Sequence, residues 1–300
     1  MKYANIVHAG RKQLGIGIGD RIIPMDIFQQ VVGHHYAGIQ GISELLDNSD
    51  LESRLISDFK THNKKLFGVA LKEDEVAFRP CAENPGKVVC IGLNYRKHAQ
   101  ETNMKIPETP VIFSKFSDTI AANDDEVPIP EVSNKIDYEG ELAILIGKRA
   151  FNVTKESALD HVFGYFVAND ISARDLQFLN GQWLLGKASP KFTPVGPYVV
   201  TGDEVGNPND LDIRTTLNGE IRQDSNTSDM VFSCDYLIHY ISKHFPLEPG
   251  DVILTGTPEG VILGYPPEKQ VWVKHGDEVI IEIEKLGKLR NTFVSASNKT

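Results

Sequence analysis

Two glutamates stand two residues apart at the start of an apolar run, in the segment DYEGELAILIG that covers residues 137–147. Side chains on a β-strand alternate between its two faces, so Glu139 and Glu141 point to the same side, about 7 Å apart along the chain. Two carboxylates beside so apolar a strand cost free energy unless a cation or hydrogen-bond donors compensate them. Mg²⁺ and Mn²⁺ prefer carboxylate oxygens, so the pair indicates either a divalent-cation site or two solvated acids at a strand end.

A third acid, Asp170, follows the apolar run 164–169. Residues 154–161 have the pattern of a capped helix, long enough for the crossover that two parallel neighbouring strands require. We therefore expect Asp170 to lie beside Glu139 and Glu141, in a site that leaves positions open for water and substrate. Cysteines or paired histidines at ligand spacing are absent from the sequence, which disfavours zinc.

The segment GLNYRKHAQE, residues 92–101, predicts a helix that carries a histidine and an acid on one face. His98 and Glu101 are three residues apart, so they can form a hydrogen bond. A carboxylate that holds an imidazole in one tautomer makes it a better general base toward a metal-activated water. The alternative is an ordinary surface pair on a polar helix.

Three further side chains are candidates for holding a ligand. Arg174 can clamp a substrate carboxylate through two hydrogen bonds, and Gln177 can orient a carbonyl; the alternative for Arg174 is an ion pair with Asp175. Thr257 lies in the turn TGTPEG, which can present its hydroxyl and backbone N–H groups to a ligand or be a turn only.

The segment GQWLLGKA, residues 181–188, narrowly misses the phosphate-binding pattern GxxxxGK[ST]. Ala188 lacks the hydroxyl that would reach magnesium, and Pro190 prevents the helix that such a loop must open. We therefore exclude ATP binding. Lys187 remains as a point cation for an anionic substrate or enolate.

The elements that must position these residues are mostly strands. Residues 1–30 alternate as a small meander, and the helical spacing of residues 42–63 predicts one or two short helices. The polar joint 82–86 separates this part from the rest. We predict an N-terminal α+β domain over 1–83 and a catalytic domain over 84–300, with a β-rich α+β fold. Strands are expected over 88–93, 111–114, 139–147, 164–169, 195–201, 212–217, 252–255, 271–273, 278–284 and 289–293, and a helix over 230–243.

Composition excludes several classes of protein. The 300 residues carry 31 basic and 41 acidic side chains, a net charge of −10, which argues against nucleic-acid binding through net charge. The sequence has no apolar run near the ~18 residues of a spanning helix and no secretory signal, so we expect no membrane partner. Three cysteines without a CxxC pair favour a reducing compartment, and we predict a cytoplasmic location.

Eight ordered segments between residues 87 and 293 resemble the fumarylacetoacetate hydrolase family, in particular its acylpyruvate hydrolases and 2-hydroxyhepta-2,4-diene-1,7-dioate isomerases. They are GLNYRKHAQE, DYEGELAILIG, GYFVANDISARDLQ, QWLLGK, PVGP, NGEIRQ, LEPGDVILTGTPEG and HGDEVIIEIEKLGKLRN. The resemblance implies a β-rich mixed fold, a homodimer, and Mg²⁺ or Mn²⁺ in an acidic pocket. By motif it implies that the metal ligands are Glu139, Glu141 and Asp170, that the water-activating dyad is His98 and Glu101, and that the groups facing the substrate are Lys187, Arg174, Gln177 and Thr257.

Two positions depart from the family pattern. Pro190 replaces an aspartate that many members have, which bears on how Lys187 is positioned. Ile91 stands near the place of a further carboxylate in the founding hydrolases, so we expect three carboxylate ligands here.

The resemblance implies a metal-dependent enzyme for 2-keto or 1,3-diketo acids. It would hydrolyse a C–C bond of an acylpyruvate or decarboxylate oxaloacetate through a metal-stabilised enolate. The alternative is an isomerase or hydratase of 2-hydroxydienedioates in the catabolism of aromatic compounds. A catalytically silent, ligand-binding relative is the third possibility.

Overall fold

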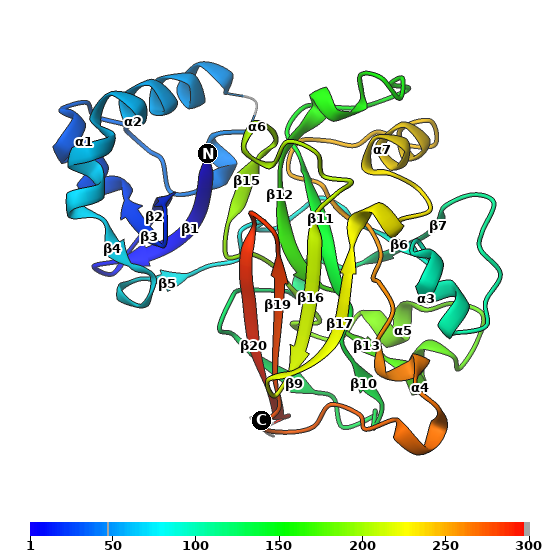
Figure 1. The fold of residues 1–300 in the computed structure, drawn as a ribbon. Coiled ribbons are helices and arrows are strands. Elements are labelled where there is room, and N and C mark those ends of the chain that lie inside the picture. Colours follow the sequence, from blue (N-terminus) through cyan, green and yellow to red (C-terminus); the bar gives the residue numbers. More distant parts are fainter. Residues whose placement is uncertain (47, 297–300) are drawn as a thin grey trace.

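The computed structural model describes residues 1–46 and 48–296, and its strands form two large sheets (Figure 1). The eleven strands of the first sheet are β1 (Lys2–His8), β2 (Arg11–Ile18), β3 (Arg21–Pro24), β4 (Leu71–Lys72), β5 (Ala77–Phe78), β6 (Val88–Gly92), β7 (Val111–Lys115), β11 (Gly140–Ile146), β12 (Val162–Asn169), β15 (Val199–Thr201) and β18 (Val252–Leu254). The five of the second are β9 (Glu126–Ile129), β16 (Asp212–Leu217), β17 (Glu220–Asn226), β19 (Glu278–Ile283) and β20 (Gly287–Ser295). Two short pairs join β8 (Ile120–Ala121) to β14 (Thr193–Pro194) and β10 (Ile136–Asp137) to β13 (Ser172–Ala173).

Helices are fewer and mostly short, which confirms the predicted β-rich α+β class. They are α1 (Met25–Val32), α2 (Ser49–Val69), α3 (Arg96–Glu101), α4 (Arg174–Gln177), α5 (Leu184–Lys187), α6 (Gly202–Val205) and α7 (Cys234–Ser242). Short 3-10 helices are η1 (Ile42–Glu44), η2 (Glu73–Glu75), η3 (Ser117–Thr119), η4 (Ala158–His161), η5 (Thr227–Asp229), η6 (Ile262–Gly264) and η7 (Pro267–Lys269). None of the helices in the described residues is long and apolar enough to cross a membrane.

The N-terminal meander is confirmed, and its first strand continues the large sheet. The order of that sheet is β4-β3-β2-β1-β15-β12-β11-β18-β6-β7, so β1 pairs with β15 from the later part of the chain. Helices α1 and α2 lie beside the meander (Figure 1). Of the one or two short helices expected over 42–63, the structure has η1 and the longer α2. Helix α2 begins at Ser49, where the Asn48 side chain accepts a hydrogen bond from the Leu51 N–H at 3.2 Å. The domain boundary at 83/84 stays a prediction.

Strands β11 and β12 are antiparallel neighbours, which corrects the predicted parallel pair with a helical crossover. Residues 154–161 form no α-helix; only η4 lies there, because an antiparallel return needs no crossover. Gly140 pairs with Asn169, and the Asp170 N–H donates to the Glu139 carbonyl at 2.9 Å. Antiparallel register therefore brings the third acid to the glutamates.

Strand β11 is buried on both faces. Leu142, Ile144 and Ile146 belong to one hydrophobic cluster, and Ala143 and Leu145 belong to another. Gly140 permits the close approach of the second sheet, since a Cβ there would lie 2.4 Å from Thr215 Oγ1. The strand that carries the glutamates is therefore fixed from both sides.

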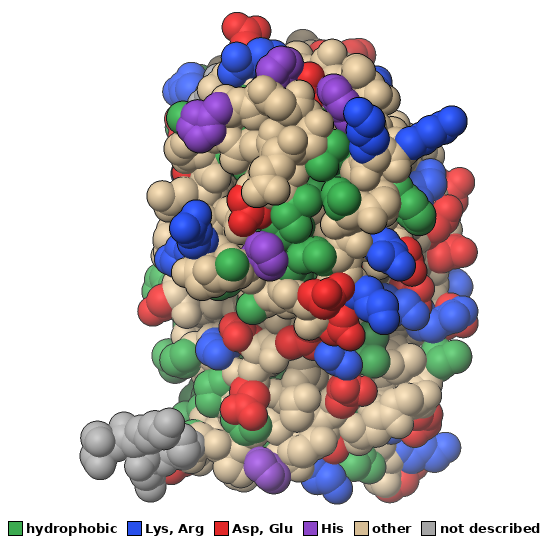
Figure 2. All heavy atoms as spheres, turned by 90° about the vertical axis from the view of Figure 1, so that its left-hand side faces the viewer, with side chains coloured by type: hydrophobic (Ala, Val, Ile, Leu, Met, Phe, Trp, Pro, Cys, Tyr) green, Lys and Arg blue, Asp and Glu red, His purple; other side chains and the backbone are tan. Residues whose placement is uncertain are grey.

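Charges of both signs are interspersed on the face that carries the N-terminal region, and a continuous basic patch is not seen on that face (Figure 2).

Among the later elements, the strand predicted over 271–273 is wrong, because Val273 makes only an isolated bridge to Ile136. The sequence reading also missed β17.

Candidate active site

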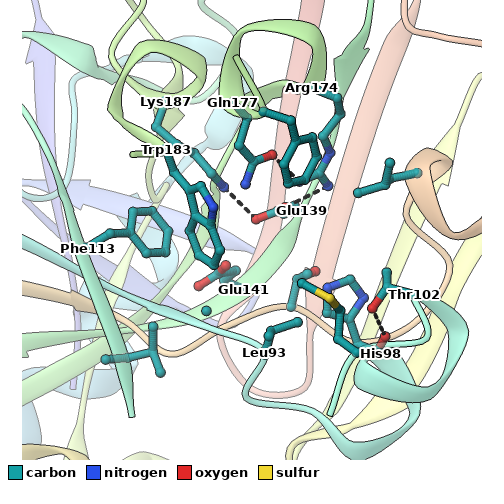
Figure 3. A pocket seen from close by; sticks show the side chains of 16 residues that line it. Leu93, His98, Thr102, Phe113, Glu139, Glu141, Arg174, Gln177, Trp183 and Lys187 are labelled. Carbon is teal, nitrogen blue, oxygen red and sulfur yellow. Dashed lines mark hydrogen bonds and ion pairs between the residues drawn. The ribbon is translucent and has the colours of Figure 1, made fainter. Parts of the chain in front are cut away.

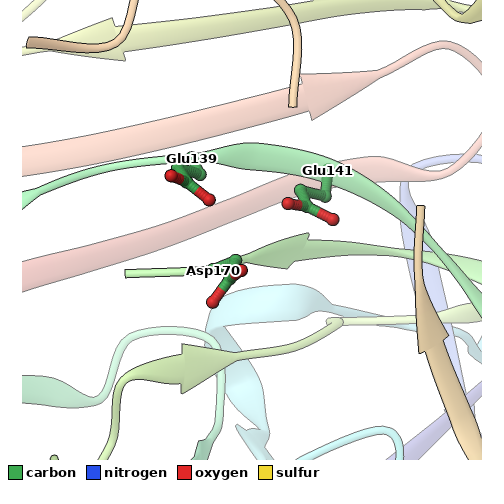
Figure 4. Close-up of side chains that lie close together, drawn as sticks. All are labelled: Glu139, Glu141 and Asp170. Atoms are coloured by element: carbon green, nitrogen blue, oxygen red, sulfur yellow. The ribbon is translucent and has the colours of Figure 1, made fainter. Parts of the chain in front are cut away.

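Three buried carboxylates meet where β11 and β12 lie side by side (Figure 4). Glu139 and Glu141 flank the first residue of β11, and Asp170 follows the last residue of β12. One oxygen from each lies within 4.8 Å of the other two, and the exposed fractions are 6%, 1% and 0%. The predicted proximity of the three acids is confirmed. Their role as metal ligands stays a prediction.

Asp170 is held by two buried lysines. Lys115 Nζ lies 2.6 Å from its Oδ1, and Lys187 Nζ lies 2.7 Å from its Oδ2. Lys115 also donates to the carbonyls of Ile171 and Phe192, at 3.2 and 2.6 Å. Burial lowers the pKa of Lys115, although Asp170 opposes that shift.

Glu139 lies between two cations. Its Oε2 accepts from Lys187 Nζ at 2.8 Å, and its Oε1 lies 2.6 Å from Arg174 Nη2. Burial disfavours ionisation of Glu139, yet Lys187 and Arg174 outweigh burial and lower its pKa. Arg174 pairs on its other side with Asp137, whose Oδ2 accepts from Nε at 2.8 Å. The alternative pairing of Arg174 with Asp175 is therefore wrong.

The substitution at Pro190 does not displace Lys187 from the site. Lys187 is the last residue of α5, and its Nζ reaches both Glu139 and Asp170. Pro190 lies three residues beyond α5, in a turn in which the Phe192 N–H donates to the Ser189 carbonyl. Lys187 therefore keeps its contacts with both acids although the aspartate is replaced.

Glu141 differs from the other two acids. Its Oε2 accepts from the Gly256 N–H at 2.7 Å, but none of the basic side chains in the described ranges forms an ion pair with it. Burial, together with the charges of Asp170 and Glu139, raises the pKa of Glu141 well above its usual range. This carboxylate is the part of the cluster that most needs an added cation.

We expect the Glu141→Gln variant to flatten the pH dependence of stability in the metal-free protein. The raised pKa means that the folded state keeps this proton to a higher pH than the unfolded chain. Its stabilising effect is therefore fully present below the ordinary Glu value of 4.5 and is lost as the pH rises toward the folded pKa. Urea unfolding in EDTA between pH 4 and 8 measures the effect, with Glu220→Gln on an exposed strand as the control. An identical pH slope in wild type and Glu141→Gln would contradict it.

His98 and Glu101 form the predicted pair. Both lie on α3, and His98 Nδ1 is 2.7 Å from Glu101 Oε1. A carboxylate only accepts, so Nδ1 carries the proton and Nε2 is free to act as a base. The second oxygen of Glu101 accepts from the Gly260 N–H at 2.9 Å.

One cavity joins this dyad to the acids (Figure 3). Figure 3 places His98 across the cavity from Lys187, with Glu139 and Glu141 between them. The residues that line it are Ile91, Gly92, Leu93, His98, Thr102, Met104, Phe113, Glu139, Glu141, Arg174, Gln177, Phe178, Trp183, Lys187, Thr257 and Leu263. Seven of the nine predicted site residues line the cavity. Of the other two, Asp170 lies in the cluster with Glu139 and Glu141, and Glu101 contacts the cavity residue His98.

The predicted substrate-facing residues are held by other side chains. Gln177 Oε1 accepts from Arg174 Nη1 at 2.9 Å. Thr257 Oγ1 donates to the Gly140 carbonyl at 2.9 Å and accepts from Gln223 Nε2 at 2.8 Å. Both side chains line the cavity, and their contact with substrate stays a prediction.

Sequence reasoning missed three residues of the site: Lys115, Asp137 and Gln223. Lys115 and Asp137 are single charges in strands, and their partners Asp170 and Arg174 are 55 and 37 residues away. Gln223 lies in the segment NGEIRQ, whose Asn-Gly pair signals a hairpin. Asn218 and Gly219 both have positive φ, at 52° and 81°, as that turn requires.

The donor set suits a hard divalent cation. Oxygens on opposite sides of Mg²⁺ lie about 4.2 Å apart, a separation that the 4.8 Å cluster accommodates. Each carboxylate oxygen has a second lone pair, so oxygens bonded to lysine can still be ligands. Glu141, which has no ion pair with a basic side chain of the described residues, supplies the electrostatic reason for a cation.

The fold and the site together define a class of enzymes. In this class, buried carboxylates beneath a small cavity can hold a divalent cation, to which a small acid can bind. The family model for the C-terminal domain of fumarylacetoacetate (FAA) hydrolase matches residues 87–294. The chain belongs to the fumarylacetoacetate hydrolase family.

Relatives and solved structures extend this result. Oxaloacetate tautomerase fahd2, mitochondrial, from Xenopus laevis is 49% identical over 214 residues, which cover 70% of this chain and 66% of that protein, just under two thirds of its length. The 2-hydroxyhepta-2,4-diene-1,7-dioate isomerase from Mycobacterium marinum is 36% identical with a TM-score of 0.66, covering 78% of this chain and 83% of that one. Maleylpyruvate hydrolase from Sphingobium sp. SYK-6, solved with manganese(II) and pyruvate, is 28% identical with a TM-score of 0.78, covering 99% and 100%.

Proposed function

We propose that the protein interconverts the keto and enol forms of oxaloacetate or a closely similar 2-keto acid. The observation that carries this proposal is the His98–Glu101 pair, because His98 lines the same cavity as Glu139 and Glu141, two of the three clustered carboxylates. The 49% identity to a protein named oxaloacetate tautomerase supports this substrate over those of the more distant relatives.

We assign Glu139, Glu141 and Asp170 as ligands of Mg²⁺ or Mn²⁺. A bound cation would supply positive charge at the carboxylate and keto oxygens of the substrate. The structure solved with manganese and pyruvate supports this choice of ion and of ligand. Arg174 and Gln177, which already form a hydrogen bond to each other, are assigned to orient the substrate carboxylate.

The proton transfer is assigned to His98. Nε2 takes a proton from the carbon beside the keto group, the C–H electron pair forms the C=C bond, and the proton is returned to the former keto oxygen. Glu101 keeps the imidazole in the required tautomer and stabilises its charged form. Lys187 faces the cavity and stabilises negative charge that develops on the oxygen.

C–C bond hydrolysis of an acylpyruvate is the second candidate. The same dyad would activate a water in place of the substrate carbon, and similarity to maleylpyruvate hydrolase supports it. Decarboxylation of oxaloacetate would use only the part of the site that stabilises the enolate.

Isomerisation of 2-hydroxydienedioates is the third candidate, supported by similarity to the isomerase from Mycobacterium marinum. It uses the same groups with a different route for the proton. The cavity is lined by His98 of the dyad, two of the three acids and two cations, Arg174 and Lys187, which argues against the catalytically silent alternative.

We expect removal of the metal to lower turnover by at least 100-fold, and Mg²⁺ or Mn²⁺ to restore it. Because Glu141 must lose its proton to bind the ion, metal binding should also release a proton at pH values below the raised pKa of Glu141. Titration calorimetry in two buffers of different ionisation enthalpy measures that proton. Unchanged turnover in the stripped protein would contradict the assignment.

The substrate is tested by parallel assays on the stripped and restored protein. Oxaloacetate enol, acylpyruvates and 2-hydroxydienedioates are compared, with pyruvate formation measured alongside tautomerisation. Metal-dependent loss of the enol signal without pyruvate formation is the expected result. Metal-dependent cleavage that exceeds tautomerisation would establish the second candidate, and the absence of turnover on every compound would overturn all three.

We also propose that the protein is a homodimer in the cytoplasm. Exposed apolar side chains on and between α4 and α5 support a subunit contact there: Phe178, Leu179 and Leu185 are 51%, 64% and 56% exposed. Light scattering of the purified chain tests the dimer. The relative from Xenopus laevis is named a mitochondrial protein, so imaging of a fluorescent fusion tests the compartment.

A further inference from the structure

The carboxylate of Glu101 lies against residues 260–264. Its Oε2 accepts from the Gly260 N–H at 2.9 Å, while its Oε1 binds His98. Gly260 has a φ of +100°, and a Cβ there would lie 2.0 Å from the Arg222 carbonyl oxygen. Only glycine fits this position, so the N–H that Glu101 uses is fixed by the backbone.

Gly264 makes room for the same carboxylate. A Cβ on Gly264 would lie 2.5 Å from both Cδ and Oε2 of Glu101 and 2.9 Å from Oε1. Gly264 ends the 3-10 helix η6 and has no left-handed φ, so its backbone would accept alanine. The three heavy atoms nearest to such a Cβ all belong to the Glu101 carboxylate.

Residues 137 and 138 anchor this segment to the strand that precedes the acids. Asp137 Oδ1 accepts from the Ile262 N–H at 2.8 Å and Oδ2 from the Leu263 N–H at 3.0 Å. The Tyr138 hydroxyl donates to the Gly260 carbonyl at 2.9 Å. Asp137 is fully buried and also binds Arg174 Nε at 2.8 Å. One buried carboxylate therefore contacts both the arginine of the site and the backbone beneath Glu101.

We infer that residues 260–264 hold the Glu101 carboxylate in position and that Gly264 is a positioning residue for the dyad. Asp137 fixes this segment relative to Arg174, since it binds both. The inference rests on the proposed function in one respect: that function assigns to the dyad the proton transfer that Gly264 would support. Gly264 acts by its missing Cβ, through Glu101, and touches no substrate.

The first test is the Gly264→Ala variant in the full chain. We expect kcat to fall at least 10-fold, with the KM for the keto acid and the affinity for Mn²⁺ changed less than 2-fold. In a Glu101→Ala background the same methyl group has nothing to displace, so Gly264→Ala should cause no further loss. Gly68→Ala in α2, where a Cβ meets nothing within 4 Å, is the control. Equal losses in both backgrounds would overturn the inference.

The second test needs no turnover. Proton–nitrogen NMR of the nine histidines, with His98 assigned through His98→Gln, should show a hydrogen-bonded Nδ1–H for His98 in the wild type. That signal should be lost in both Gly264→Ala and Glu101→Ala and kept in Gly68→Ala. A retained signal in Gly264→Ala overturns the inference, whereas lost signals in a protein that turns over no keto acid overturn only the proposed function.

The role of Asp137 is tested with Asp137→Asn. We expect it to raise the KM through Arg174 and also to weaken the His98 Nδ1–H signal, since an amide cannot accept from Arg174 and both backbone N–H groups. A change in KM with the NMR signal intact would show that Asp137 serves Arg174 alone and would overturn this part. If the variant does not fold, the Gly264→Ala measurements still test whether residues 260–264 hold Glu101 in position.

Discussion

We expect the Asp170→Asn variant to lose metal binding and stability together, with the free energy of unfolding lowered by about 3–5 kcal/mol. Lys115 and Lys187 contact the two oxygens of Asp170 at 2.6 and 2.7 Å, and both lysines are buried. An amide carries no charge and turns an NH₂ donor toward one lysine. Lys187 keeps its ion pair with Glu139, whereas Lys115 keeps the carbonyls of Ile171 and Phe192 and loses its carboxylate. The melting temperature should fall on the order of 10 °C. Scanning calorimetry of the metal-free protein and Mn²⁺ titration measure the two losses.

Two matched variants separate these effects. Glu141→Gln should also lose metal affinity but should not destabilise the metal-free protein at pH 7, because Glu141 has no cation to leave unpaired among the described side chains. Adding Lys115→Met to Asp170→Asn removes the stranded charge, so stability should recover while metal binding does not. Metal affinity retained in Asp170→Asn would exclude it as a ligand.

Local geometry made part of the site predictable from sequence. Glu139 and Glu141 share a face because strand side chains alternate, and His98 and Glu101 meet because helical residues three apart are neighbours. Both relations depend only on the conformation of a few adjacent residues. The structure accordingly has both, with the dyad atoms 2.7 Å apart.

Contacts between residues of different elements could not be predicted from the sequence. Asp170 was expected at the acids for a wrong reason, since a helical pattern at 154–161 suggested a parallel crossover where the chain returns antiparallel. Lys115 and Asp137 have no local pattern, because a buried charge is identified by its partner, and each partner comes from another element. The hairpin at Asn218 is different, because its Asn-Gly pair is a local turn signal from which sequence alone predicts a hairpin.

We expect the His98→Gln variant to reduce kcat for tautomerisation by about 10²–10⁴-fold while it leaves Mn²⁺ affinity unchanged. The glutamine amide can still donate a hydrogen bond to Glu101, so the local structure is kept, but an amide does not accept and return a proton at neutral pH. Decarboxylation of oxaloacetate, which needs only enolate stabilisation by the carboxylate and lysine side, should be spared. Stopped-flow loss of the enol absorbance and pyruvate formation measure the two reactions on one sample.

Exchange with deuterated water identifies the step that His98 performs. Wild-type protein loaded with Mn²⁺ should accelerate deuterium uptake at the carbon beside the keto group, and His98→Gln should lose that acceleration to the same degree as kcat. His244→Gln, an exposed histidine after α7, should match the wild type in both measurements. If deuterium uptake persists in His98→Gln while kcat falls, the proton is carried by another group and His98 acts on a later step. If kcat itself is unchanged, the dyad has no part in tautomerisation, and the carboxylate cluster with Lys187 alone must account for turnover.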